Sequence, residues 1–173
     1  VRVPARSLVH RVLPAYFFFF FFFFSDTATT EISTLSLHAA LPIYSAGGGL
    51  VLSVLLNARD AGVPLPAAGV CFSPWVDLEC TGESMAANDH LDDFIKYGGL
   101  AARAESYLSG ADPKNPLASA LYADLHGLPP LLVHVGSAET LLDDSTRLAS
   151  LATEAGIDLT LTVRDDRVLV WQA

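Results

Sequence analysis

The sequence is poor in cysteine and in basic residues, and each shortage argues against a class of protein. Its two cysteines, Cys71 and Cys80, are too few for the disulfide framework of a small secreted domain. No group of cysteine and histidine residues has the spacing of zinc ligands, and we expect neither a metal nor an organic cofactor. Only 10 Lys and Arg residues stand against 19 Asp and Glu residues, for a formal net charge of −9. This charge argues against nucleic acid as a partner.

Phenylalanine is scarce outside a single segment. Eight of the ten phenylalanines form one unbroken run, Phe17 to Phe24. At about 150–250 Å² per ring, the run carries roughly 1,200–2,000 Å² of apolar surface, more than a soluble monomer normally exposes. Three arginines precede it, so Val12 to Phe24 has the charge order of a signal peptide, although it is shorter than the ~20 residues that span a bilayer. One interpretation is therefore a secreted or membrane-anchored protein, targeted by residues 1–24.

The next segment favours a different interpretation. Asp26 to Ile43 reads DTATTEISTLSLHAALPI and resembles a translated sequencing adapter, which reads DTATTEIYTLSLHDALPI in one frame. The two strings differ only at Ser33 and Ala39. We therefore expect residues 17–44, the phenylalanine run and the adapter-like string, to be a sequence artefact outside the fold. Residues 1–16 have no assigned origin.

Residues 45–173 alternate between helical and strand patterns. Apolar periodicity and glycine stops predict helices over 50–61 and 142–155. Short apolar runs bounded by proline or glycine predict strands over 67–72, 131–135 and 157–163. The polar segment 83–109 is predicted to be helical, with Gly98 and Gly99 interrupting it. Such alternation predicts an α/β fold with a mostly parallel sheet flanked by helices.

A family resemblance rests on blocks in this second part. The string Ser45-Ala46-Gly47-Gly48-Gly49-Leu50 opens an apolar helix and looks like the nucleophile elbow of α/β-hydrolases. The later blocks SPWVDL from Ser73, the segment 112–119, LPP from Leu128 and GSAETLLDD from Gly136 follow in order. Together they resemble the bacterial hormone-sensitive-lipase-like esterases. The resemblance implies that residues 45–173 are the carboxyl-terminal part of an incomplete α/β-hydrolase domain, with a partial cap at about 83–109.

The resemblance implies a carboxylesterase or lipase-like hydrolase that acts through an acyl-serine intermediate. Ser45 would be the nucleophile, and the amide of Ala46 would donate to the oxyanion. The Gly-X-Ser-X-Gly pattern keeps Gly47 but has Ile43 at its first glycine, where a β-branched side chain crowds the turn. Without the resemblance, the same Ala-Gly-Gly-Gly tract would be interpreted as a flexible turn.

The acid of the catalytic triad should follow a strand further along the chain. Glu139 lies in the turn after the strand predicted at 131–135, at the position where the family carries its aspartate or glutamate. Asp143 and Asp144 are the alternative candidates for this acid. Since they open a helix, we expect them to cap it and to interact with its dipole.

The triad histidine is missing. The family has a segment like Trp-Asp-Asp-Met-X-His-X-Trp after its last strand, and the corresponding residues here read RDDRVLVW from Arg164. Leu169 therefore stands at the histidine position. His90, His126 and His134 do not replace it, because they lie in the cap, in a loop and within a strand. Residues 1–44 also contain neither the family's His-Gly-Gly-Gly oxyanion loop nor an expected strand to support Ser45.

These observations predict a fragment of a serine carboxylic-ester hydrolase that is inactive as written. Its parent would act on a small-molecule ester in the cytoplasm, with no nucleic acid or membrane as a partner. The alternative is a non-catalytic binding protein on the same fold, secreted or anchored through residues 1–24. The sequence leaves open the acyl and alcohol preference, the oligomeric state and the origin of Leu169.

Overall fold

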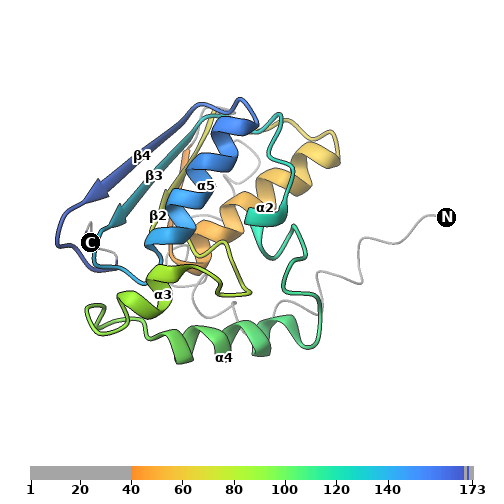
Figure 1. Cartoon of the computed structure of the whole chain (residues 1–173). Helices are drawn as coiled ribbons and strands as arrows, with labels where there is room; N and C mark the ends of the chain where they lie inside the picture. Colours follow the sequence, from red (N-terminus) through yellow and green to blue (C-terminus); the bar gives the residue numbers. More distant parts are fainter. Residues whose placement is uncertain (1–39, 170, 172–173) are drawn as a thin grey trace, which may run out of the picture. The chain divides into compact units, whose positions relative to one another are not determined.

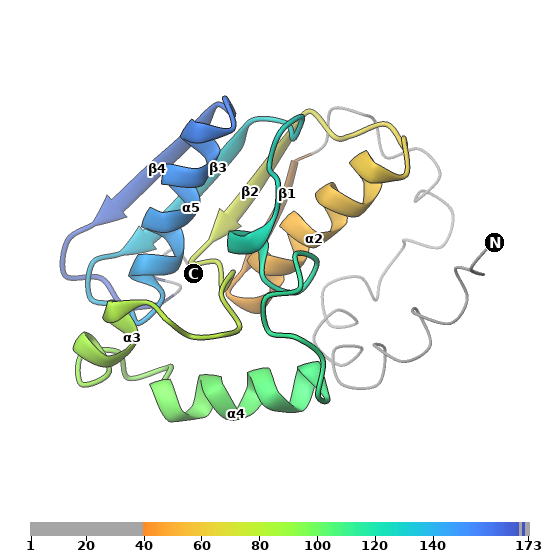
Figure 2. The ribbon, with the colours of Figure 1, turned by 45° about the vertical axis from the view of Figure 1, so that its right-hand side comes forward.

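The computed structural model describes residues 40–169 and 171, with side chains from residue 44 onward. Their centre is a four-stranded sheet in the order β1-β2-β3-β4, seen from one side in Figure 1 and from another side, with all its strands labelled, in Figure 2. All three neighbouring pairs are parallel, which confirms the sheet that the alternating pattern predicts. The strands are β1 (Ala40–Tyr44), β2 (Ala68–Phe72), β3 (Leu131–Gly136) and β4 (Leu159–Arg164).

Helices lie on one face of this sheet and beyond one of its ends. The helices are α2 (Ala46–Asp60), α3 (Glu83–Ala87), α4 (Tyr97–Leu108) and α5 (Leu142–Glu154), with a 3-10 turn, η2, at Ala120–Tyr122. Both α2 and α5 lie on one face of the sheet, while α3 and α4 lie beyond the carboxyl ends of the strands (Figures 1 and 2). Within the described residues, none of the helices combines the length and apolar composition needed to cross a bilayer.

The main core fills the space between the sheet and the helices α2 and α5. Leu52, Leu56 and Leu148 from these helices are almost fully buried against Cys71 and Val133 of the central strands. Burying one such aliphatic side chain stabilises the fold by about 1.5–3 kcal/mol. This packing buries one side of the helix predicted at 50–61, whereas Leu50 and Val54 on its other side are exposed.

A second hydrophobic cluster lies beside the first and joins the loops at the carboxyl ends of the strands. Its buried members are Trp75, Leu78, Cys80, Met85, Leu100, Ala104, Leu141 and Leu169, and Ala46 packs against it. These residues come from the turns after β1, β2, β3 and β4 and from α3 and α4. The second cluster therefore brings together segments that are far apart in the sequence.

The predicted helical segment 83–109 differs from expectation in where it breaks. Gly98 and Gly99 lie inside the first turn of α4, and the chain is interrupted between α3 and α4 instead. The side chain of the fully buried Asp92 accepts hydrogen bonds from its own loop, and that of Asp89 accepts one from the amide of Tyr97, the first residue of α4. Asp side chains that bind nearby amides compete with helical hydrogen bonds, which explains the break.

Residues 40–44 were expected to lie outside the fold, but they form β1 and support Ser45. They pair in parallel with residues 68–72, and the amide of Ser45 donates to the carbonyl of Phe72 at 2.9 Å. A parallel ladder is made by backbone groups, so an extended segment can join it whatever its origin. The phenylalanine run and most of the adapter-like string lie outside the described residues.

Candidate active site

Ser45 occupies a strained turn between β1 and α2. Its backbone angles are φ 51° and ψ −120°, a conformation that costs a residue with a side chain about 1–3 kcal/mol. The turn is tied on the other side by the carbonyl of Ser45, which accepts from the amides of Gly48 at 2.9 Å and Trp75 at 3.0 Å. The hydroxyl of Ser45 does not cap α2. A serine held in this way has the geometry of a nucleophile elbow.

The start of α2 is pressed closely against the loop after β2. A Cβ atom on Gly49 would overlap the carbonyl oxygen of Trp75, so only glycine allows this approach. Ala46 is the first residue of α2, and amides in the first turn of a helix have no acceptor within that helix. Together with the positive end of the helix dipole, the amide of Ala46 is suited to donate to an oxyanion.

Glu139 is fully buried in the turn after β3, and its two carboxylate oxygens differ sharply. Oε1 accepts hydrogen bonds from the amide of Gly136 at 2.7 Å and from the hydroxyl of Ser73 at 2.9 Å. Oε2 is buried and has no hydrogen-bond partner. Burial raises the pKa of Glu139 to about 7, although the two donors to Oε1 act in the opposite direction. The charge of Asp92 raises this pKa further.

The turn that carries Glu139 is anchored by side chains from the segment 83–109. The amide nitrogen of Asn88 donates to the carbonyls of Ser137 at 3.1 Å and Glu139 at 2.8 Å. The buried carboxylate of Asp92 accepts from the amide of Thr140 at 3.3 Å. The segment 83–109 therefore helps to fix the position of the candidate acid.

The segment after β4 is docked on the same turn. The carbonyl of Arg167 accepts from the amide of Ala138 at 3.1 Å, and that of Arg164 accepts from the amide of Ser137 at 2.8 Å. A Cβ atom on Gly136 would overlap the carbonyl of Arg167. The backbone after β4, which leads to Leu169, is thus held against the turn that carries Glu139.

Leu169 lies in the second hydrophobic cluster and is only 8% exposed. Ala46, which packs against this cluster, follows Ser45, and Leu141, a member of the cluster, comes two residues after Glu139. The structure therefore brings Ser45, Glu139 and Leu169 to the same end of the sheet, in loops joined by one cluster. A leucine side chain has no atom that can accept the proton of Ser45.

Asp143 and Asp144 lie in the first turn of α5, as expected, but their carboxylates do not cap that helix. Asp144 is fully buried and accepts from the amides of Val76 at 2.8 Å and Asp77 at 2.9 Å, while Asp143 accepts from the amide of Ser84. Burial raises the pKa of Asp144 to about 7. Both side chains fix the segment after β2, so the expectation of simple helix caps is wrong.

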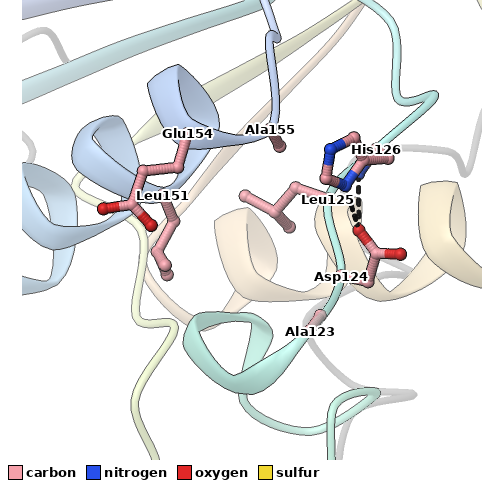
Figure 3. A pocket seen from close by; sticks show the side chains of 7 residues that line it. All are labelled: Ala123, Asp124, Leu125, His126, Leu151, Glu154 and Ala155. Atoms are coloured by element: carbon pink, nitrogen blue, oxygen red, sulfur yellow. Dashed lines mark hydrogen bonds and ion pairs between the residues drawn. The ribbon is translucent and has the colours of Figure 1, made fainter.

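His134, His126 and Cys71 make contacts away from Ser45 and Glu139. His134, in β3, stacks on Trp171 with 6.0 Å between ring centroids. His126 pairs with Asp124 at 2.6 Å beside an exposed cleft of about 160 Å³, and this cleft contains neither Ser45 nor Glu139 (Figure 3). Burial raises the pKa of the Cys71 thiol to about 12, so it is no nucleophile.

Three residues of the site were missed from the sequence, namely Ser73, Asn88 and Asp92. Each makes its contact with a segment more than 40 positions away along the chain. Sequence patterns report local periodicity and contain little information about such contacts. For Ser73, the sequence signals were its position directly after a buried strand and at the start of the block SPWVDL.

Comparisons with known proteins concern the fold of the chain. A family model described as the alpha/beta hydrolase fold matches residues 44–172. An acetyl-hydrolase from Streptomyces hygroscopicus is 46% identical over 127 residues, which are 73% of this chain and 42% of that protein.

Solved structures give the same result. The crystal structure of an esterase from the bacterial hormone-sensitive lipase family matches with a TM-score of 0.75 and 54% identity, over 77% of this chain and 45% of that chain. An esterase/lipase from an uncultured bacterium matches with a TM-score of 0.75 and 47% identity, over 78% of this chain and 45% of that chain. The chain thus spans less than half the length of each of these relatives.

Proposed function

The chain belongs to the α/β-hydrolase family, in its hormone-sensitive-lipase-like branch, and from this premise we propose that it is part of a cytoplasmic serine carboxylic-ester hydrolase. The observation that carries the proposal is the strained backbone of Ser45, which turns from β1 into α2 with φ 51°. Such strain is retained where it serves a function. The substrate class that fits a serine nucleophile of this family is a small carboxylic ester.

In the intact enzyme, the hydroxyl of Ser45 attacks the carbonyl carbon of the ester while a histidine takes its proton. The carbonyl oxygen becomes an oxyanion, which accepts a hydrogen bond from the amide of Ala46. When the tetrahedral intermediate collapses, the alcohol leaves with the proton from the histidine and the acyl group stays on Ser45. Water then attacks the acyl-serine, with the same histidine acting as the base, and releases the carboxylic acid.

Glu139 supports the histidine in this scheme. Its Oε2 is buried without a partner, in the turn against which the segment after β4 is docked. We propose that an imidazole at position 169 donates its N–H to this unpaired oxygen. Ionised Glu139 would orient the ring and stabilise the imidazolium that forms during the reaction.

The chain as written carries Leu169 in place of this base, so we propose that it is inactive. We also propose that residues 17–43 are an artefact joined to a truncated esterase gene. Long-read sequencing across residues 16–45 at the source locus tests this origin. Recovery of the phenylalanine run and adapter-like codons from a natural, unamplified transcript would refute it.

The test of the function uses a full-length gene with histidine at position 169. We expect it to cleave p-nitrophenyl esters and to lose that activity on Ser45→Ala. Full activity of the Ser45→Ala variant would rule out Ser45 as the nucleophile.

A second candidate function is a non-catalytic binding protein, and the burial of Leu169 favours it. Leu169 packs among apolar side chains of the second cluster, so a leucine is well accommodated there. This candidate predicts ligand binding without turnover, even after Leu169→His in the full-length gene.

A further inference from the structure

Ser73 is a buried serine outside the elbow whose hydroxyl binds the carboxylate of Glu139. It is fully buried, and its Oγ donates to Oε1 of Glu139 at 2.9 Å. We propose that Ser73 is a positioning residue, which holds Oε1 of Glu139 so that Oε2 remains the oxygen available to a triad histidine. This inference rests on the proposed function, in which Glu139 is the acid of the triad.

The backbone fixes the place of this hydroxyl. The amide of Ser73 donates to the carbonyl of His134 at 2.7 Å, which continues the hydrogen bonding between β2 and β3 by one residue. Ser73 also has φ 48°, a conformation that side chains rarely adopt. Its hydroxyl therefore approaches Glu139 from the carboxyl end of β2, where the backbone is still held by the sheet, and not from a flexible loop.

The two hydrogen bonds to Oε1 of Glu139 leave Oε2 as the oxygen that can accept a bond from a histidine. Oε1 receives both the Ser73 hydroxyl and the Gly136 amide, whereas Oε2 is buried and receives neither. If the hydroxyl were absent, the carboxylate could rotate and share the Gly136 amide between its oxygens. The bond from Ser73 opposes this rotation, and bonds to an ionised acceptor are stronger than neutral ones.

The hydrogen bond from Ser73 can be detected through its effect on the pKa of Glu139. Burial and the charge of Asp92 both raise the pKa of Glu139, and the bonds from Gly136 and Ser73 lower it. Removing one of these two donors should therefore raise this pKa, because the charged form loses a hydrogen bond. A serine that only fills space would not change it.

The first experiment titrates the Glu139 carboxyl by carbon-13 NMR in the 173-residue chain. We expect Ser73→Ala to raise the pKa of Glu139 by about one unit, or about tenfold in proton affinity. Ser73→Gly should give the same rise although it suits the positive φ and relieves the backbone. It also serves as the measured variant if Ser73→Ala does not fold.

The matched control is Ser84, a second buried serine near the same turn. Its hydroxyl donates to the carbonyl of Thr140 at 2.7 Å and not to a carboxylate. We expect Ser84→Ala to leave the pKa of Glu139 unchanged. An unchanged pKa in the folded Ser73 variants, with stability lost in Ser73→Ala and recovered in Ser73→Gly, would overturn the inference in favour of a purely structural role.

The second experiment separates this inference from the proposed function. In the Leu169→His variant, the imidazole N–H bonded to Glu139 should give a low-field proton resonance, which both Glu139→Gln and Ser73→Ala should abolish. If the resonance is absent from Leu169→His or survives Glu139→Gln, the role of Glu139 as the triad acid is contradicted. If Glu139→Gln abolishes it and Ser73→Ala leaves it intact, only the positioning role of Ser73 is refuted.

Discussion

The backbone carbonyl of Arg167 fills the space that a Cβ atom on Gly136 would occupy. Gly136 ends β3, and its amide is also one of the two donors to Oε1 of Glu139. Gly136 thus donates a hydrogen bond to the candidate acid, and its lack of a side chain leaves room for the segment that leads to Leu169. A change at Gly136 should therefore affect both.

Gly136→Ala should destabilise the fold, because the added methyl must displace the backbone of Arg167. We expect the free energy of unfolding in urea to fall by about 1–3 kcal/mol. Gly98→Ala is the control, since Gly98 lies in α4 with nothing within 4 Å of an added Cβ. It should be stabilising by up to about 1 kcal/mol. Equal stability of the two variants would contradict the close approach at Gly136.

Ser45→Gly should stabilise the chain. Glycine adopts positive φ without steric cost, so the strain at φ 51° would be relieved by about 1 kcal/mol or more. Ser45→Ala keeps a Cβ atom and should leave the free energy of unfolding nearly unchanged. Differential scanning calorimetry of the three proteins measures the difference. A Ser45→Gly variant less stable than Ser45→Ala would show that the turn is not strained.

Stability should fall as the pH rises from about 4 to about 7. The folded-state pKa values of Glu139 and Asp144 are both raised to about 7, from ordinary values of 4.5 and 3.8. In this window the folded chain binds more protons than the unfolded chain, so each added pH unit favours unfolding. The total effect should be several kcal/mol, because each unit by which a folded-state pKa is raised contributes about 1.4 kcal/mol.

Urea unfolding at several pH values between 4 and 8 measures this dependence. Glu139→Gln removes one of the two groups and should flatten the curve without reversing it. The lowered pKa of Asp77, which is bonded to Thr81 and Arg147, acts only below its ordinary value of 3.8. Stability that rises between pH 4 and 7 would contradict the protonated burial of Glu139 and Asp144.

The 173-residue chain should show no esterase activity above background. Loss of one essential triad member typically costs about 10⁴–10⁶ in turnover, and in the proposed function Leu169 stands where the base would be. We expect no rescue by Leu169→His alone, since the His-Gly-Gly-Gly oxyanion motif does not occur in residues 1–173. Hydrolysis of p-nitrophenyl butyrate by purified protein is the measurement. A burst of p-nitrophenol that depends on Ser45 would disprove the expectation.

Much of the fold was predictable because proline and glycine residues mark the ends of its strands and helices. Pro129 and Pro130 precede the run Leu131 to Val135 and Gly136 follows it, and β3 spans Leu131–Gly136. The predicted helix 142–155 is observed as Leu142–Glu154, where Gly156 with φ 68° follows the helix end. Such punctuation acts within a few residues, so it can be recognised in a single sequence.

The contacts that fix the site could not be predicted in the same way. Asp144 was expected to serve its own helix, yet its carboxylate binds amides 67 and 68 positions away. Glu139 was identified through a family resemblance, but the difference between its two oxygens depends on Ser73, which a different strand positions. These relationships exist only after the sheet has assembled.

Among the described residues β1 is the first strand of the sheet, and Pro42 leaves its side away from β2 without one hydrogen-bond donor. The amide of Ser45 points toward β2, and amides alternate in direction along a strand, so position 42 directs its nitrogen away from β2. A proline has no hydrogen there to donate, which suits a border of the sheet and not its interior. A sheet extended past β1 would leave a carbonyl of the added strand unpaired at this point. Pro42→Val would supply the missing donor and would open this border to association with another strand, including one from a second molecule.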